Sequence, residues 1–188
     1  AVLLFFSTFI QNYFNARLFN RVSTSVAIMA VLAIGQTLVV LTRNIDLSVG
    51  SIVGFTAYFV GQQLSHNNEI EPFVAILMAI GVGALLGAFN GFFVAYCRIP
   101  AIIVTLGTMA LFRTMLVEYS DAQTVLTVNL PQWLLDLPRL NVFSYGRLHI
   151  RAIVVGMLAV FVFFHFLLRY TSFGRRIYAI GSNPEAAK

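Results

Sequence analysis

The sequence predicts an all-α fold, a polytopic transmembrane helical bundle of about five to six spans in which one span is broken or short. Of the 188 residues, 59% are apolar and only 10% are charged. A soluble globular chain carries about 25% charged residues, because its surface has to be solvated. The apolar residues also gather into runs that can cross a bilayer as helices, for which about 20 residues are needed.

The same composition excludes other classes of protein. Disordered chains are poor in Phe, Leu, Val and Ile, whereas these residues are abundant here. The net charge of +5 could suggest a nucleic-acid partner, but the basic residues stand singly among apolar runs and form no stripe. Basic loops beside a membrane explain them better, so we expect contact with membrane lipid and none with nucleic acid.

The first half of the chain predicts three spans. Residues 1–10 are the end of a span, and the polar residues 11–21 form a turn in water. Residues 22–42 carry no charge and make a full crossing. The next apolar run, residues 51–64, is too short to cross unless residues 47–50 join it. This crossing is therefore predicted to be short or broken at its start.

The second half predicts three further spans. Residues 72–97 begin with a proline that suits a first helical turn, and they cross with room for tilt. Residues 101–117 form the next span and include Arg113, and residues 152–168 form the last. The polar residues 118–150 are predicted to be an extracytoplasmic loop, with a short interfacial helix at Trp133.

Residues 169–188 close the chain as a polar segment. A weak excess of basic residues places this segment in the cytoplasm. The order Asn183, Pro184, Glu185 is typical of a helix start, with a cap, a proline and an acid in the first turn. The chain begins without Met inside an apolar run and stops within this segment, so we expect it to be a piece of a longer polypeptide.

No catalytic signature is present. The sequence lacks the Gly-rich phosphate-binding loop, the His-Glu-x-x-His motif and the Gly-x-Ser-x-Gly motif. The histidines His66, His149 and His165 are too dispersed for a metal site, and we interpret them as interfacial or hydrogen-bonded. We therefore expect neither a catalytic residue nor a metal nor a cofactor in this chain.

Small and polar residues within the spans are candidates for packing and for a solute path. Glycines recur every four residues, a spacing typical of close helix packing in lipid. These glycines are Gly50 and Gly54 in one span, and Gly83, Gly87 and Gly91 in another. The alternative is that such a face borders a polar conduit. Side chains that could then meet a hydroxyl-rich solute are Gln36, Asp46, Asn90, Thr105 and Thr108.

Asp46 is the acid whose position is most informative, because it lies among apolar neighbours between two closely spaced spans. An ionised carboxylate at the bilayer centre costs about 2.5 to 3.5 kcal/mol, so Asp46 must be paired or close to water. One interpretation makes it the cap of a broken helix, with Arg43 as its local partner. The other is direct contact with the solute or with coupling machinery.

Three stretches resemble one family of transport proteins. They are Ile45–Ser51 (IDLSVGS), the segment from Asn90-Gly91 through Pro100–Thr108 (PAIIVTLGT), and Phe173–Ala187 (FGRRIYAIGSNPEAA). Together they are similar to the membrane subunits of bacterial ATP-binding-cassette importers for simple sugars, the ribose, xylose, rhamnose and autoinducer-2 permease family. The similarity of residues 17–61 favours a rhamnose-type permease.

The resemblance implies a function and a set of partners. Residues 1–188 would be a partial permease domain of a multi-pass subunit in the bacterial inner membrane, translocating a simple sugar delivered by a periplasmic binding protein. A second permease copy and a cytoplasmic ATP-binding subunit, which binds the ATP and Mg, would complete the importer. In this family a Glu-Ala-Ala segment docks into the ATPase, which implies a coupling role here for Gly181, Asn183, Glu185, Ala186 and Ala187.

Two other functions remain open at this point. A secondary transporter or channel for a small polar solute also uses broken helices, and Asp46 would then be an ion site. A purely structural membrane subunit would tolerate replacement of Gly181 and Glu185 without loss of transport.

Overall fold

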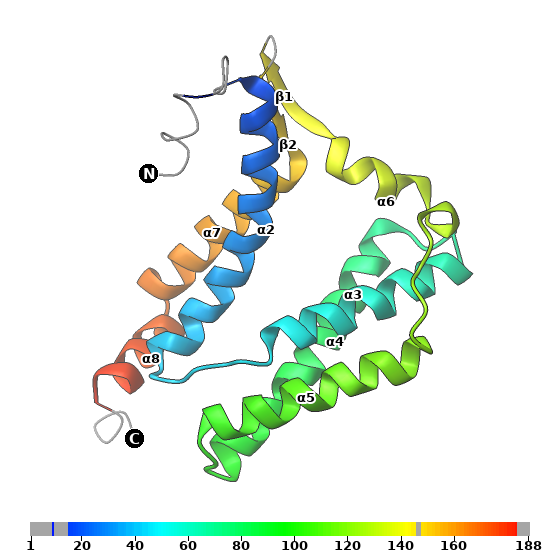
Figure 1. Cartoon of the computed structure of the whole chain (residues 1–188). Helices are drawn as coiled ribbons and strands as arrows, with labels where there is room; N and C mark the ends of the chain where they lie inside the picture. Colours follow the sequence, from blue (N-terminus) through cyan, green and yellow to red (C-terminus); the bar gives the residue numbers. More distant parts are fainter. Residues whose placement is uncertain (1–8, 10–14, 146–147, 184–188) are drawn as a thin grey trace.

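A computed structural model of the chain describes residue 9, residues 15–145 and residues 148–183 (Figure 1). Long helices joined by short turns make up most of it, and the predicted helical bundle is confirmed. The elements in chain order are α2 (Ala16–Leu41), α3 (Val49–His66), α4 (Pro72–Gly91), η1 (Phe92–Tyr96), α5 (Ala101–Ser120), η2 (Thr127–Asn129), α6 (Gln132–Asp136), η3 (Leu137–Arg139), β1 (Asn141–Tyr145), β2 (Leu148–Arg151), α7 (Ala152–Tyr170) and α8 (Ser172–Ser182).

Four stretches of the described helices are long and apolar enough to cross a membrane. They are Leu18–Leu41, Pro72–Tyr96, Ala101–Ser120 and Ala152–Tyr170. Helix α3, where the sequence predicts a short or broken crossing, is not one of these four stretches, and Gln62, Gln63 and His66 make its last turn polar. The span predicted for residues 1–10 lies outside the described residues, except for Phe9.

Local sequence explains where the helices begin and end. Asn15 Oδ1 accepts a hydrogen bond from Leu18 N at 2.8 Å and so caps α2. Pro72 opens α4 in its first turn, as predicted. Just beyond α2 and η1, Arg43 and Arg98 have φ values of 60° and 57°. This left-handed backbone stops a helix and turns the chain.

The helices form two groups (Figure 1). In the first group α2 packs along α7 and against β2, and α8 packs against α7 and the end of α2. In the second group α3 lies against both α4 and α5. Residues 42–48 join the groups beside α8, which we call the α8 end. Residues 121–140 join them at the opposite end, which we call the hairpin end.

The loop at the hairpin end contains the short helix that the sequence predicts at Trp133, because α6 includes this residue. It also contains an antiparallel hairpin of β1 and β2, which the all-α prediction leaves out. Phe143 lies opposite Ile150 in this pairing, and the strands are rich in the β-branched and aromatic residues that favour a sheet.

Few large apolar side chains are buried within the described residues. The buried apolar residues are Ala27, Leu64, Ala75, Val104, Phe112 and Ile177. Most Phe, Leu, Ile and Val side chains of the spans are exposed, as expected for helices whose surroundings are lipid or other membrane helices.

Candidate functional site

The segment between α2 and α3 is held by a chain of polar side chains, which we call the polar junction. Its members are the side chains of Gln36, Asp46, Ser48, Asn90 and Thr105, together with the backbone carbonyls of Ile45 and Asp46. Asp46 Oδ1 accepts from the backbone N of Ser48 at 2.8 Å and from Ser48 Oγ at 2.6 Å. Asp46 thus accepts from a following backbone N–H, as the capping interpretation predicts, but the cap residue of α3 is Ser48 and Asp46 forms a turn two residues before it.

Ser48 extends the junction to α4. Its side chain is fully buried, and its Oγ accepts from Asn90 Nδ2 at 2.7 Å while it donates to Asp46. A hydroxyl that donates and accepts at once joins two bonds into one network, and such networks fix the positions of their members. The start of α3 is therefore tied to α4.

Two further side chains bind the backbone of the segment. Gln36 Nε2 of α2 donates to the carbonyl of Asp46 at 2.7 Å, and Thr105 Oγ1 of α5 lies 3.4 Å from the carbonyl of Ile45. Carbonyl groups outside a helix need such partners inside a membrane, because lipid supplies none. Side chains from α2, α4 and α5 thus meet at one short piece of chain.

A cavity of about 290 Å³ opens beside the junction. It is lined by Leu38, Val39, Thr42, Asn44, Ile45, Asp46, Gly87, Asn90, Gly91, Val94, Ala101 and Thr105. Asn90 is 6% exposed, and its Oδ1 has no hydrogen-bond partner. A buried amide oxygen without a donor is costly, and Asn90 is one of the residues that line the cavity.

The structure brings together four of the residues predicted to meet a solute. Asp46, Asn90 and Thr105 line the cavity, and Gln36 bonds the backbone behind it. Thr108 lies one turn further along α5, is 6% exposed, and donates to the carbonyl of Thr105 at 3.4 Å. Its hydroxyl is used within its own helix, and Thr108 is not among the residues that line this cavity.

Ser48 is central to the junction and was not among the predicted site residues. A local signal for it exists, because Asp46 precedes it by two positions at the start of an apolar run. Asp and Ser at that spacing favour a capped turn. No local signal indicates the bond to Asn90, since the two residues are 42 positions apart.

The glycines differ in their surroundings. Gly87 and Gly91 line the cavity, and no atom lies within 4 Å of the point where a Cβ would stand on Gly50, Gly83, Gly87 or Gly91. At Gly54 the nearest atom is Leu116 Cδ2, at 3.6 Å. Their role in helix packing therefore stays a prediction.

A close backbone approach occurs instead at Gly181 in α8. A Cβ on this residue would overlap the carbonyl oxygen of Leu41, the last residue of α2. Beside it, Arg43 Nη2 donates to the carbonyl of Ser182 at 3.1 Å. Arg43, expected to pair with Asp46, thus binds the end of α8, while Asp46 is bound by Ser48. The end of α8 rests on the segment that carries the junction.

Asn183 closes α8, and its backbone N donates to the carbonyl of Ala179 at 2.9 Å. The polar segment is thus already helical from Ser172, earlier than the start predicted at Asn183. The residues Glu185, Ala186 and Ala187 lie outside the described residues, so their coupling role stays a prediction.

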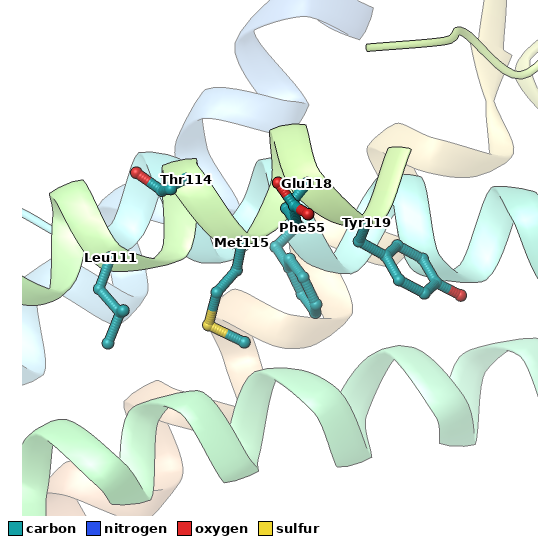
Figure 2. A pocket seen from close by; sticks show the side chains of 6 residues that line it. All are labelled: Phe55, Leu111, Thr114, Met115, Glu118 and Tyr119. Carbon is teal, nitrogen blue, oxygen red and sulfur yellow. The ribbon is translucent and has the colours of Figure 1, made fainter. Parts of the chain in front are cut away.

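A second pocket, of about 420 Å³, lies between α3 and α5 (Figure 2). Phe55, Leu111, Met115 and Tyr119 give it mainly apolar walls, and Thr114 and Glu118 complete its lining. Figure 2 shows Leu111, Met115 and Tyr119 pointing to the same side of α5. Such walls do not suit a hydroxyl-rich solute.

Comparison with known proteins adds an independent finding. The model of one protein family, described as the permease component of the branched-chain amino acid transport system, matches residues 18–188. No solved structure matches the chain.

Curated relatives carry the name autoinducer 2 import system permease protein LsrC. Those of Yersinia pseudotuberculosis serotype O:1b, Yersinia enterocolitica serotype O:8 and Yersinia pestis strain Pestoides F are each 38% identical over 180 residues, which is 95% of this chain. The matched part is 48%, 47% and 48% of the respective relative. The chain thus spans about half the length of the curated relatives it matches.

Proposed function

The chain belongs to the family of permease components of branched-chain amino acid transport systems, and from this premise we propose that it forms part of the membrane-spanning subunit of an ATP-driven importer. Its family and its four long apolar helices place it in the bacterial inner membrane as a multi-pass protein. In the proposal a periplasmic binding protein delivers the solute, and a separate cytoplasmic subunit binds ATP and Mg and hydrolyses the ATP.

The contact of α8 with Arg43, in the same short segment that carries the polar junction, is the observation that supports this proposal. Arg43 holds the last turn of α8, and two residues further on the same segment begins the junction that bonds α2, α4 and α5. A movement imposed on α8 therefore reaches three spans through a few residues. This supports the α8 end as the cytoplasmic end, where an ATPase would act.

The cavity beside the junction supports a simple sugar as the solute. Its polar lining consists of amide, hydroxyl and carboxylate groups, and none of its residues is Lys or Arg. An amino acid carries a carboxylate, which proteins bind with Arg or Lys. A neutral polyhydroxylated molecule needs only acceptors and donors such as Asp46, Asn90 and Thr105. The relatives are named for autoinducer 2 and the family for branched-chain amino acids, so the solute has to be tested directly.

Reconstitution tests the proposal. The full-length subunit is placed in liposomes with its binding protein and ATPase, and ATP hydrolysis is measured with pentoses, deoxyhexoses and branched-chain amino acids. We expect one of the sugars to stimulate hydrolysis and to be taken up. Stimulation by amino acids alone would refute the sugar, and uptake that needs no ATPase and collapses with the proton gradient would favour a secondary transporter.

A matched pair of variants tests the coupling. Replacing Arg43 by Ala removes the bond to Ser182 and should lower the sugar-stimulated hydrolysis. Arg98→Ala is the control, because Arg98 is exposed, shares the left-handed backbone and makes no bond to α8. Equal loss in both variants would refute the proposed role of Arg43.

A further inference from the structure

The cavity of about 290 Å³ beside the polar junction, which we call the junction cavity, uses its side-chain donors within the protein. Thr42 Oγ1, in its lining, donates to the carbonyl of Val39 at 2.8 Å. Asn44 Nδ2, also in the lining, donates to the carbonyl oxygen of Thr42 at 3.0 Å and to Thr42 Oγ1 at 3.1 Å. The donor atoms of both side chains therefore have acceptors inside the chain.

Two further lining residues carry polar hydrogens on their side chains, and they are engaged as well. Asn90 Nδ2 donates to Ser48 Oγ at 2.7 Å. Thr105 Oγ1 lies 3.4 Å from the carbonyl oxygen of Ile45 and 3.5 Å from that of Ile102. Each side-chain donor atom of the described lining thus has an acceptor within the protein.

The acceptors of the lining are less fully used. Asp46 Oδ1 accepts two hydrogen bonds from Ser48, whereas Asp46 Oδ2 and Asn44 Oδ1 accept none from the described residues. An ionised carboxylate can only accept hydrogen bonds, and both of its oxygens can do so. The junction cavity therefore suits a molecule that donates hydrogen bonds, as a molecule with several hydroxyl groups does.

The charge of the lining comes from Asp46, the one charged residue among the described residues that line the cavity. Arg43 and Arg98 lie near it in sequence or near other lining residues, but both are exposed to solvent. Arg43 binds the carbonyl of Ser182, and within the described part of the chain neither arginine forms an ion pair with Asp46. A half-buried carboxylate without a paired cation repels anions at short range, because salt screens it less than an exposed charge.

Ser48 fixes the position of this carboxylate. Because Ser48 Oγ accepts from Asn90 Nδ2, its own hydrogen is available to Asp46 Oδ1, at 2.6 Å. The backbone N of Ser48 donates to the same oxygen at 2.8 Å. Both bonds hold Oδ1 and leave Oδ2 as the free oxygen, so the buried network sets the position of the charge before any solute enters.

We propose that Asp46 is a specificity-determining residue, whose carboxylate excludes anionic solutes from the junction cavity and admits neutral polyhydroxylated ones. The inference rests on the proposed transport function for the class of solute, and it assigns the discrimination to one residue. Neutral sugars enter, whereas sugar acids, which carry a carboxylate of their own, are rejected. Placing like charges together in a binding site weakens binding, and we expect a discrimination of about tenfold.

Charged thiol reagents measure this exclusion without any solute. The full-length subunit is used with its cysteines replaced, Cys97 by Ser in this chain, and Val94→Cys is introduced in the cavity lining. The reaction rates of an anionic and a cationic methanethiosulfonate of similar size are then compared. We expect Asp46→Asn to raise the ratio of the anionic to the cationic rate about tenfold, and Asp46→Ser to act in the same direction. An unchanged ratio in both variants would overturn the proposal.

Two controls separate the charge from the structure of the junction. Ser48→Ala disturbs the same network but keeps the carboxylate, so the ratio at Val94→Cys should stay close to that of the unchanged protein. Ala179→Cys lies on the exposed part of α8 outside the cavity lining, and there Asp46→Asn should have little effect. A change in either control as large as that of Asp46→Asn at residue 94 would overturn the proposal.

Protection by solutes extends the test to sugars. Ribose and its acid, ribonate, are compared as protectants of Val94→Cys against a neutral maleimide. We expect ribose to slow the reaction and ribonate to do so only in Asp46→Asn. Equal protection by ribonate and ribose in the protein with Asp46 would overturn the proposal. Protection by neither in any variant would count against a sugar as the solute, while the ratio of the charged reagents still decides the role of Asp46.

Discussion

The two ends of the bundle are held together in different ways. At the α8 end, one short segment accepts bonds from both helix groups, since Gln36 belongs to the first group while Asn90 and Thr105 belong to the second. At the hairpin end, each bond of the loop reaches one group only. Trp133 Nε1 donates to the carbonyl of Ile70 at 3.2 Å, beside α3 and α4.

Two further bonds at the hairpin end join the loop to the first group. The backbone N of His149 donates to Asn20 Oδ1 at 3.3 Å, and Arg151 Nη1 donates to Thr24 Oγ1 at 3.1 Å. The α8 end therefore fixes the two groups to each other, whereas the hairpin end fixes the loop to each of them separately. Changes at the α8 end should disturb transport more than changes at the hairpin end.

The largest effect is expected at Gly181. Even the single methyl group of Gly181→Ala overlaps the carbonyl oxygen of Leu41, so α8 must move away from α2. Overpacking costs about 1 to 3 kcal/mol, and we expect ATP-driven uptake to fall about tenfold in proteoliposomes. Gly156→Ala in α7 is the control, because no atom lies within 4 Å of its Cβ position. Unchanged uptake in Gly181→Ala would contradict the greater importance of the α8 end for transport.

Asn90 should show the next largest effect. In Asn90→Leu, Ser48 loses the donor that now reaches its Oγ at 2.7 Å, inside a buried network. Leaving a buried polar group without a partner costs about 1 to 3 kcal/mol, which thermal unfolding of the detergent-solubilised subunit would detect. Thr124→Val is a suitable control, since Thr124 is exposed in the loop after α5. Equal melting temperatures for the two variants would show that the bond from Asn90 to Ser48 does not stabilise the protein.

Substitutions of Asp46 distinguish a structural role at the start of α3 from a role as an ion site. Asn caps a helix about as well as Asp, whereas Ala loses about 0.5 to 2 kcal/mol. We expect Asp46→Asn to keep most of the uptake and stability, and Asp46→Ala to lower both. The comparison uses uptake and thermal unfolding in the same preparations. Complete loss of uptake in Asp46→Asn with unchanged stability would show that the charge itself is needed, as in an ion site.

The smallest effect is expected at Trp133, which represents the hairpin end. Trp133→Phe keeps the ring but removes the bond to Ile70, worth about 0.5 to 1.5 kcal/mol. Because this bond reaches only the second group, uptake should stay close to that of the unchanged protein. A loss as large as that of Gly181→Ala would show that both ends are equally important.

Much of the fold could be predicted because bilayer thickness sets the length of a span. Residues 72–97 and 101–117 are predicted as crossings by charge and length alone, and Pro72 and Trp133 indicate a helix start and a short helix. The hairpin was missed because its two short strands lie inside a polar loop, where four or five residues of alternating character give a weak signal.

The candidate site could be predicted only in part. Asp46 could be predicted as a site residue because a carboxylate among apolar residues has to be paired or lie close to water. The partners of the junction come from distant positions, such as Asn90 for Ser48 and Ser182 for Arg43, which are 42 and 139 residues apart. No local pattern encodes such contacts. The expected pairing of Arg43 with Asp46 is therefore wrong, because Arg43 binds Ser182 and Asp46 binds Ser48.

The pairing of α2 with α7 has a consequence for biosynthesis. Helices α3, α4 and α5 are neighbours both in sequence and in space, so they can associate as soon as the third has left the ribosome. Helix α2 is made before them, yet its partner ends only at Tyr170. During translation α2 therefore lies in the bilayer without its partner until more than a hundred further residues have been added. Over this time lipid or the insertion machinery has to cover its apolar surface.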